Sequence, residues 1–253
     1  MHRHVYLPLL LVATLAPARP AAAQGWSWPE RAENLQDLPA DFPPNRLRAV
    51  MTGFTRSLGV RCSYCHVGEE GQPLSTYDFP SDEKVQKRTA REMLRLLGSV
   101  NEHLGNIEPT GEKVNMWCFT CHAGRARPQV LEEALMETYR AEGIDAAVAK
   151  YGALRERYYG RGAYNFSERS LNVMGYQLLR EGDHEGAIRI FHLNTEHNPE
   201  SANVWDSLAE GYMTAGMNGP ARIFYRKSLE LNPQNQNAID KLAEIDAAEE
   251  ATP

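Results

Sequence analysis

The 253-residue chain lacks an apolar run of the roughly 20 residues that a helix needs to cross a bilayer. Its most apolar stretch, residues 5–15, follows His2, Arg3 and His4 and leads into small residues that end at Ala23. This three-part pattern is typical of a cleavable secretory signal. We therefore expect residues 1–23 to be removed after Ala23, leaving a soluble periplasmic protein with no transmembrane anchor.

Basic residues are too few for a nucleic-acid-binding surface to be expected. The chain has 27 Lys and Arg against 33 Asp and Glu, and removal of residues 1–23 takes away two basic residues and no acids. Most of the acidic excess falls in residues 167–253. Because phosphate backbones attract cationic proteins, this balance disfavours a nucleic-acid partner.

Cysteine is also scarce, and its spacing argues against disulfides. An exported chain with four cysteines would ordinarily form two bridges. Here Cys62 and Cys65 are followed at once by His66, and Cys118 and Cys121 by His122. Two thiols three residues apart followed by histidine form the attachment pattern of a c-type haem. The pattern predicts two covalent haems, with the four thiols as thioethers and no cysteine left for a disulfide.

The histidine of each motif is the expected proximal ligand of the iron. His66 and His122 would supply one imidazole nitrogen, with the other held by a backbone carbonyl. A zinc site is the first alternative, but its Cys pairs usually lie 15–20 residues apart, whereas 52 residues separate Cys65 from Cys118. A thioredoxin-like pair is the second, but it belongs in a βαβ unit, and this neighbourhood favours helix and loop.

A second axial ligand is expected on the helix that precedes each motif. Apolar residues at helical spacing predict one helix ending near Gly59, with Met51 on its apolar face. A second helix is expected to open with Ser81 as its cap and to carry Met93 centrally on an apolar stripe. Methionine is a common axial ligand in electron-transfer haems. His103 is a rival to Met93, whereas Met116 stands too close to Cys118 to reach the opposite face of that haem.

Several segments together resemble the cytochrome subunit of photosynthetic reaction centres and its shorter relatives. They are Asn34-Leu35 with Leu38-Pro39, MTGFTRSLGVRCSYCH (51–66), KRTAREMLRLL (87–97) and CFTCHAGRARP (118–128). In that family a methionine of the helix ahead of each motif ligates the iron, so the resemblance assigns Met51 and Met93 as axial ligands. It covers about residues 34–128. This chain has two haem motifs where the reaction-centre subunit has four, so a role in photosynthesis does not follow.

The C-terminal half shows a repeat of 34 residues. Pro199 and Pro233, Gly182 and Gly216, and Ala187 and Ala221 are each one period apart. That period is typical of tetratricopeptide repeats, which dock peptides or proteins on a concave surface. Two full repeats are visible, and we expect helices in residues 129–159 to pack on one end and residues 238–245 to cap the other. His184, His192 and His197 are expected to be ordinary polar surface positions.

These observations predict an all-α protein in five parts. They are a signal peptide (1–23), a linker (24–40), a dihaem cytochrome domain (41–128), bridging helices (129–166) and a tetratricopeptide-repeat region (167–253). The expected function is single-electron transfer without catalysis, with a redox partner protein bound by the repeats. A dihaem peroxidase-like oxidoreductase and a haem-bearing periplasmic adaptor remain alternatives.

Overall fold

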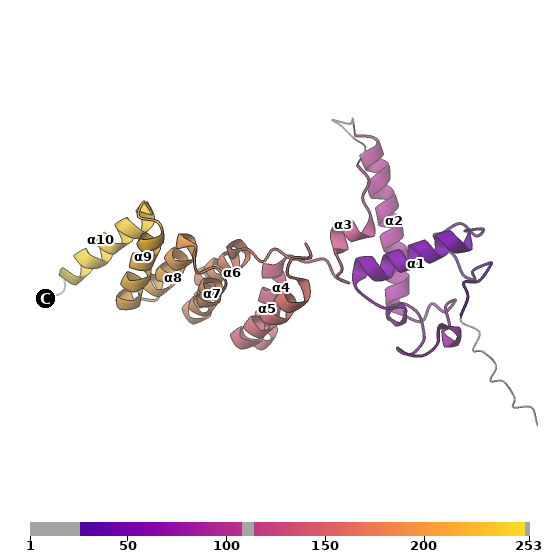
Figure 1. Cartoon of the computed structure of the whole chain (residues 1–253), viewed down its shortest axis with the longest axis horizontal. Helices are drawn as coiled ribbons and strands as arrows, with labels where there is room; N and C mark the ends of the chain where they lie inside the picture. The colour runs from indigo at the N-terminus through magenta and orange to yellow at the C-terminus, as the bar shows by residue number, and fades with distance from the viewer. Residues whose placement is uncertain (1–25, 108–113, 251–253) are drawn as a thin grey trace, which may run out of the picture.

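The computed structural model describes residues 26–107 and 114–250, and in this part of the chain the expected all-α fold is confirmed (Figure 1). The only β pairing among the described residues is an isolated bridge between Val67 and Asp78. The expected signal peptide lies outside the described residues. None of the described helices combines the length and the apolar character that a membrane span requires.

The N-terminal unit is built from three helices and two short 3₁₀ turns. They are α1 (Pro44–Leu58), the turns Cys62–Tyr64 and Leu74–Thr76, α2 (Val85–Gly105) and α3 (Cys118–His122). Helix α1 starts at proline, whose missing N–H costs nothing in a first turn. It ends at Gly59, which has the left-handed φ of 65°. The helix end expected at Gly59 is therefore confirmed.

The expected start of α2 at Ser81 is wrong, because the helix begins at Val85 after Lys84. Residues 81–83 are held in a preceding loop by other bonds. The Ser81 hydroxyl accepts from the N–H of Glu83 at 3.2 Å, and the carboxylate of Asp82 accepts from Arg91 at 2.8 Å. Ser81 therefore takes part in a turn and Asp82 in an ion pair. Serine and aspartate are as common in turns as at the N-terminal caps of helices.

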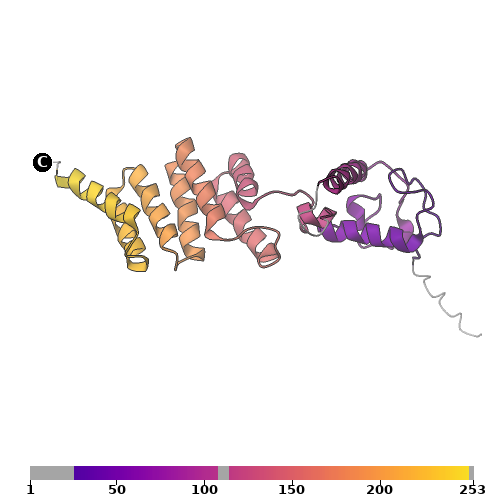
Figure 2. The same ribbon diagram turned by 90° about the horizontal axis from the view of Figure 1, so that it is seen from above.

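The C-terminal unit is an array of antiparallel helix pairs stacked side by side (Figures 1 and 2). The pairs are α4 (Leu131–Glu142) with α5 (Ile144–Tyr158), α6 (Glu168–Glu181) with α7 (His184–His197), and α8 (Ala202–Thr214) with α9 (Asn218–Leu231). Helix α10 (Gln236–Glu250) closes the end. The 34-residue period therefore corresponds to helix pairs, and Ala238 and Ile245 of α10 are buried as expected for a cap.

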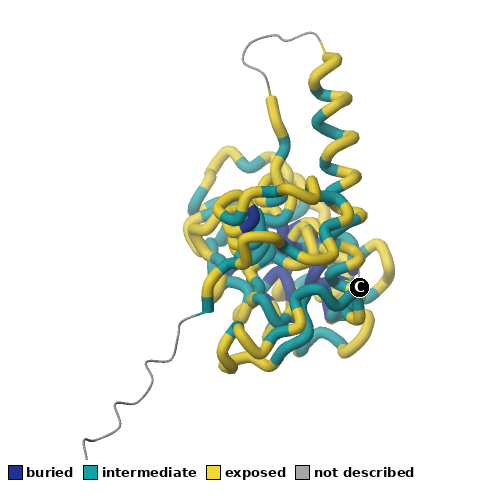
Figure 3. The backbone as a smooth tube through the Cα atoms, turned by 90° about the vertical axis from the view of Figure 1, so that its right-hand side faces the viewer, coloured by how far each residue is buried: buried dark blue, intermediate teal, exposed yellow. Residues whose placement is uncertain are grey.

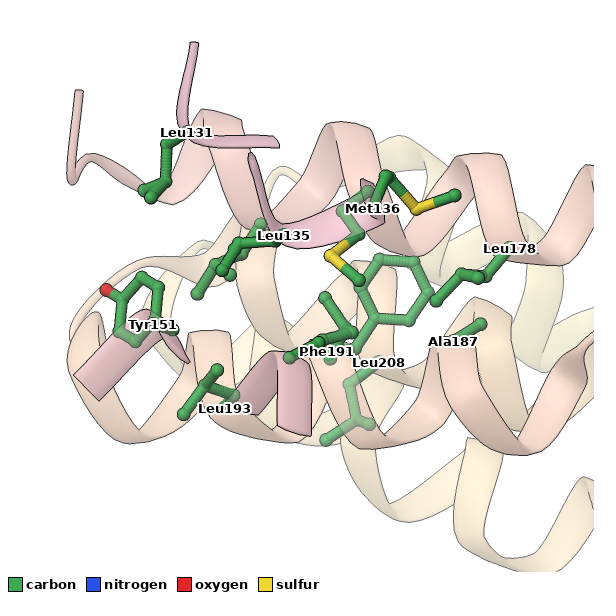
Figure 4. Packing of buried hydrophobic residues seen from close by; sticks show 13 residues of the cluster. Leu131, Leu135, Met136, Tyr151, Leu178, Ala187, Phe191, Leu193 and Leu208 are labelled. Atoms are coloured by element: carbon green, nitrogen blue, oxygen red, sulfur yellow. The ribbon is translucent and has the colours of Figure 1, made fainter. Parts of the chain in front are cut away.

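One apolar core joins the helices of residues 129–159 to the first repeat (Figure 4). Leu135 of α4 and Tyr151 of α5 are buried in the same cluster as Leu178 of α6 and Phe191 of α7. A second cluster around Tyr225 packs α8 and α9 against α10. Full burial of each such side chain contributes about 1.5–3 kcal/mol to folding. The array thus has a continuous core of its own.

The N-terminal unit, in contrast, has almost no core made of protein. Among the described residues, Leu47 is the one buried apolar side chain that precedes residue 129, and all the others lie in the array. Helix α2 has no buried residue along its 21 positions. In Figure 3 the C-terminal half of this helix stands clear of the rest of the molecule, with few neighbours. An amphipathic helix without a buried face is typical of a surface that a ligand or another molecule covers.

Candidate functional site

The first motif forms a tight helical turn that follows directly on the end of α1. Within it the N–H of Cys65 donates to the carbonyl oxygen of Cys62 at 3.2 Å, and the N–H of His66 donates to the same oxygen at 2.9 Å. The chain reverses at Gly59, so this turn lies beside the helix that it follows. The spacing of the motif is therefore realised as one compact turn.

Met51, Cys62, Cys65 and His66 line a single cavity of about 370 Å³. Its walls come from α1, the first motif, the loop before α2, and α2 itself. Its apolar lining residues include Trp26, Trp28, Leu35, Leu38, Leu47, Phe54, Leu58, Val60, Leu74, Phe79, Ala90 and Leu94. A cavity with a mostly apolar surface and some polar and charged groups is typical of a cofactor site. The donor set and the lining both fit a covalently held porphyrin.

His66 is oriented from behind by a backbone carbonyl. Its Nδ1 lies 3.3 Å from the carbonyl oxygen of Phe79, and its ring packs edge-on against the Phe79 ring at 5.0 Å. Burial lowers the pKa of His66, and the nearby Lys87 cation lowers it further. A neutral imidazole whose Nδ1–H is bound in this way has Nε2 available for iron.

The second motif is the short helix α3, and its histidine is oriented in a similar way. His122 Nδ1 lies 2.9 Å from the carbonyl oxygen of Arg125. The N–H of Trp117 is bound by the hydroxyl of Thr120 at 3.0 Å, which caps the turn. Both motifs therefore supply the carbonyl partner that a proximal histidine requires. None of the four cysteines forms a disulfide.

Apolar side chains near Met93 on α2, and others at the second motif, are exposed rather than enclosed in a cavity. Met93 is 41% exposed on α2 and is not among the residues that line the first cavity. Leu96 on the same helix is 54% exposed, and Trp117 beside α3 is 56% exposed. Large exposed apolar side chains are typical of surfaces that a ligand or another molecule covers. The pairing of Met93 with His122 stays a prediction.

The two motifs are brought together by a close backbone contact. The N–H of Gly124, just after the second motif, donates to the carbonyl oxygen of Ser57 at 2.9 Å. A Cβ added to Gly59, just before the first motif, would lie 2.1 Å from the carbonyl oxygen of Gly124. Both glycines also have a positive φ. The contact therefore requires glycine, and it places the two motifs next to each other in space.

Arg125 links the second motif to the helical array. Its Nε donates to the carbonyl oxygen of His122 at 3.1 Å, and its guanidinium also donates to the carbonyl oxygen of Gln129. The same guanidinium stacks on the ring of Tyr164, with its carbon 4.4 Å from the ring centroid. Tyr164 packs in turn against the first core cluster of the array. The His122 end of the second motif is thus tied to the array.

A groove lies on the array between α6 and α8. Its lining residues are Glu168, Arg169, Asn172, Val173, Tyr176, Arg180 and Asn203. Asn203 donates to Glu168 at 3.0 Å across the two helices, and the hydroxyl of Tyr176 bonds to Glu210 at 2.8 Å. The groove is lined by two guanidinium groups, one carboxylate and two amide groups.

His192 differs from the polar surface position expected for it. Its Nε2 lies 2.8 Å from the hydroxyl of Tyr212, and its ring packs edge-on against the rings of Tyr212 and Phe224. Burial lowers its pKa. The expectation was wrong here because the aromatic partners lie 20 or more residues away, where helical periodicity does not reveal them.

Some residues of the first cavity were missed by sequence reasoning. Trp26 and Trp28 line it although they fall in the segment interpreted as a linker, and the ring of Trp26 lies 5.3 Å from that of Phe79. Two tryptophans so close in sequence were the signal available for this contact. Lys87 also lines the cavity. It lies in a stretch rich in Lys and Arg, so the sequence alone does not distinguish it from the basic residues around it.

Comparison with known proteins finds similarities in both units. The family model described as "Photosynthetic reaction centre cytochrome C subunit" matches residues 15–150. The photosynthetic reaction center cytochrome c subunit of Roseobacter denitrificans is 33% identical over 98 residues, which are 38% of this chain and 25% of that protein. Cytochrome c-554 of Chloroflexus aurantiacus is 42% identical over 67 residues, or 26% of this chain and 14% of that protein.

Tetratricopeptide repeat protein 37 of Xenopus laevis is 29% identical over 104 residues, which are 41% of this chain and 6% of that protein. The matched stretches thus span at most a quarter of these relatives' own lengths. A solved structure, "First TPR of Spaghetti (RPAP3) bound to HSP90 peptide SRMEEVD", aligns with 48% of this chain and 91% of its own. The alignment has 17% identity and a TM-score of 0.35, too low to support an argument.

Proposed function

The chain belongs to the photosynthetic reaction centre cytochrome c subunit family, and from this premise we propose that it is a periplasmic electron carrier with two covalent c-type haems. Each bound haem would supply an iron that takes up and releases one electron. Cys62 and Cys65 would hold the first haem, and Cys118 and Cys121 the second. His66 and His122 would be the proximal ligands, with Met51 and Met93 on the opposite faces.

The observation that carries this proposal is the missing protein core of the N-terminal unit. Leu47 alone is a buried apolar residue among the described residues before 129, and none of the apolar residues of α2 is buried. A unit of this size cannot be stable with so little apolar burial unless a large apolar group fills it. Two porphyrins attached at the two motifs would supply that burial.

Electron transfer rather than substrate chemistry is favoured by the ligand set. Met51 and His66 line the same cavity, so both axial positions of the first iron would be filled by the protein. An iron with two protein ligands has no open position for a substrate. The contact between Gly124 and Ser57 holds the two motifs near each other, which would favour passage of an electron between the haems that they bind.

A redox titration followed in the visible spectrum tests the proposal. Protein produced with export and haem-attachment machinery should be coloured and should show two one-electron waves. Its intact mass should exceed that of residues 24–253 by two haems. Colourless protein, or protein with a single haem, would contradict the proposal. A low-spin spectrum in both redox states is expected, because each iron has two protein ligands.

We further propose that the groove between α6 and α8 binds the redox partner. The array has a core of its own, so it can provide the docking surface without the cytochrome unit. Reversal of the charges at Arg169 and Arg180, which line the groove, should abolish retention of the partner from a periplasmic extract. The matched control reverses Arg189 and Arg226, two exposed arginines on α7 and α9, and should leave retention unchanged. Equal retention by both double variants would contradict this site.

A further inference from the structure

Lys87 is a nearly buried cation in the wall of the first cavity. Its side chain is 13% exposed. The Nζ donates to the carbonyl oxygens of Phe79 and Pro80 at 2.9 Å and of Ser81 at 2.8 Å, and it lies 3.1 Å from the carboxylate of Asp82. The three N–H groups of an ammonium are thus fully used by the loop that precedes α2.

The carbonyl oxygen of Phe79 is bound by two groups at once. It is the oxygen that lies 3.3 Å from His66 Nδ1, and it also accepts from Lys87. A carbonyl oxygen that already accepts a hydrogen bond from an ammonium is a weaker acceptor for the imidazole N–H. The imidazole then has less anionic character and is a weaker donor to iron. A weaker donor stabilises the oxidised iron less, because the oxidised iron carries the higher positive charge.

The charges around Lys87 act in the same direction. Asp82 is the acidic partner of Lys87, but it is shared with Arg91, whose side chain is 12% exposed and lies 2.8 Å away. Two cations and one anion leave a net positive charge in this wall. A positive charge near a buried site favours the state with the lower positive charge.

We propose that Lys87 is a positioning residue of the first haem and raises its reduction potential through the shared Phe79 carbonyl and its own charge. This inference rests on the proposed function, since it requires a haem in the first cavity. The second motif differs here, because the carbonyl oxygen that meets His122 belongs to Arg125, whose own guanidinium bonds to Gln129 and stacks on Tyr164.

Three variants of the full-length haem-loaded protein test the proposal by redox titration. Lys87→Met removes the charge and should lower one of the two midpoint potentials while the other stays unchanged. A change of roughly tenfold in the reduction equilibrium is expected, which corresponds to ~59 mV for a one-electron couple. Asp82→Asn removes the counter-charge and should raise the same potential. Arg48→Met removes a charge at an exposed position of α1 that does not line the cavity, and should move neither.

The opposite signs separate an electrostatic role from a structural one. If Lys87 only fastened the loop, both Lys87→Met and Asp82→Asn would admit water to the cavity and shift the potential in the same direction. Shifts of the same sign, or no shift in either variant, would overturn the inference while two intact haem waves leave the proposed function standing. If Lys87→Met binds no haem, Asp82→Asn decides alone, since an unchanged or lower potential overturns the inference. Absence of haem from the wild-type protein would instead refute the proposed function.

Discussion

Asn101 and Met116 exchange a pair of hydrogen bonds that ties the approach to the second motif onto α2. Asn101 Nδ2 donates to the carbonyl oxygen of Met116 at 2.9 Å, and the N–H of Met116 donates to Asn101 Oδ1 at 2.7 Å. Cys118 follows two residues later, so this amide fixes where the second motif starts relative to the helix that carries Met93. It acts as a side-chain clamp in a unit with little apolar core.

Asn101→Leu should therefore loosen the second haem site. The substitution keeps the size of the side chain but removes both bonds, and we expect a loss of about 2 kcal/mol in the free energy of unfolding of the N-terminal unit. Denaturant unfolding followed by haem absorbance measures this loss. Glu102→Gln, at the next and exposed position, is the control and should unfold like the wild type. Equal midpoints for the two variants would show that the clamp contributes nothing.

Met51→Ala and Met93→Ala should each convert one haem to a high-spin form and lower its reduction potential. Loss of a thioether ligand opens one axial position and removes the soft donor that favours reduced iron. The visible spectrum and a redox titration report both changes. Met116→Ala is the control and should leave both haems low-spin. Unchanged spectra in Met93→Ala together with a high-spin haem in His103→Ala would reassign the second ligand to the histidine.

Much of the fold could be predicted because it depends on short-range patterns. The end of α1 at Gly59 follows from one glycine after an apolar periodicity, and the structure shows the left-handed φ that glycine adopts there. The helix pairs of the array follow from the 34-residue period. The two cysteine motifs could be identified from the spacing of their cysteines and histidine alone. In each case the information lies within a few residues or repeats regularly.

The errors and omissions have a common physical cause, which is contact at spacings other than the three or four residues of helical periodicity. Ser81 was expected to cap α2, but Asp82 is drawn into an ion pair with Arg91, and the cap moves to Lys84. Trp26 reaches Phe79 across more than 50 residues of chain. The bond between Lys87 and the Phe79 carbonyl depends on a loop whose path has no sequence signature. Such contacts become visible only when the chain is folded.

His192 should make the array less stable in mild acid. Burial lowers the pKa of His192 from 6.5; the charge of Glu196 raises this pKa and that of Arg189 lowers it. Because burial has the largest effect, the folded state binds a proton more weakly than the unfolded state does. Its contribution to stability is therefore fully present above pH 6.5 and is lost as the pH falls below that value. Urea unfolding followed by far-ultraviolet circular dichroism at about pH 7.5 and about pH 5.5 measures the difference.

The variant His192→Gln should reduce that pH dependence. The amide is neutral at both pH values, so the part of the difference that His192 causes disappears. Glu185→Gln, at an exposed position of the same helix, is the control for substitution in α7. A pH dependence as large in His192→Gln as in the wild type would show that another group carries it.

Substitution by alanine should have opposite effects on the stability of the array at Gly175 and at Gly152. A Cβ at Gly175 in α6 would lie 2.4 Å from Cε1 of the buried Phe191, whereas a Cβ at Gly152 in α5 would meet no atom within 4 Å. Gly175→Ala should cost about 1–3 kcal/mol because the Phe191 ring must move within a packed core. Gly152→Ala should stabilise the array by about 0.5–1 kcal/mol, since alanine favours helix over glycine.

Thermal unfolding followed by far-ultraviolet circular dichroism should give a lower midpoint for Gly175→Ala and a higher one for Gly152→Ala. The redox waves of both variants should match the wild type, because the two glycines lie in the array and not in the cytochrome unit. A lower midpoint for Gly152→Ala would show that α5 is packed more tightly than the structure indicates. Altered redox waves in Gly175→Ala would show instead that the array transmits strain to the haems, for which the stacking of Arg125 on Tyr164 provides the route.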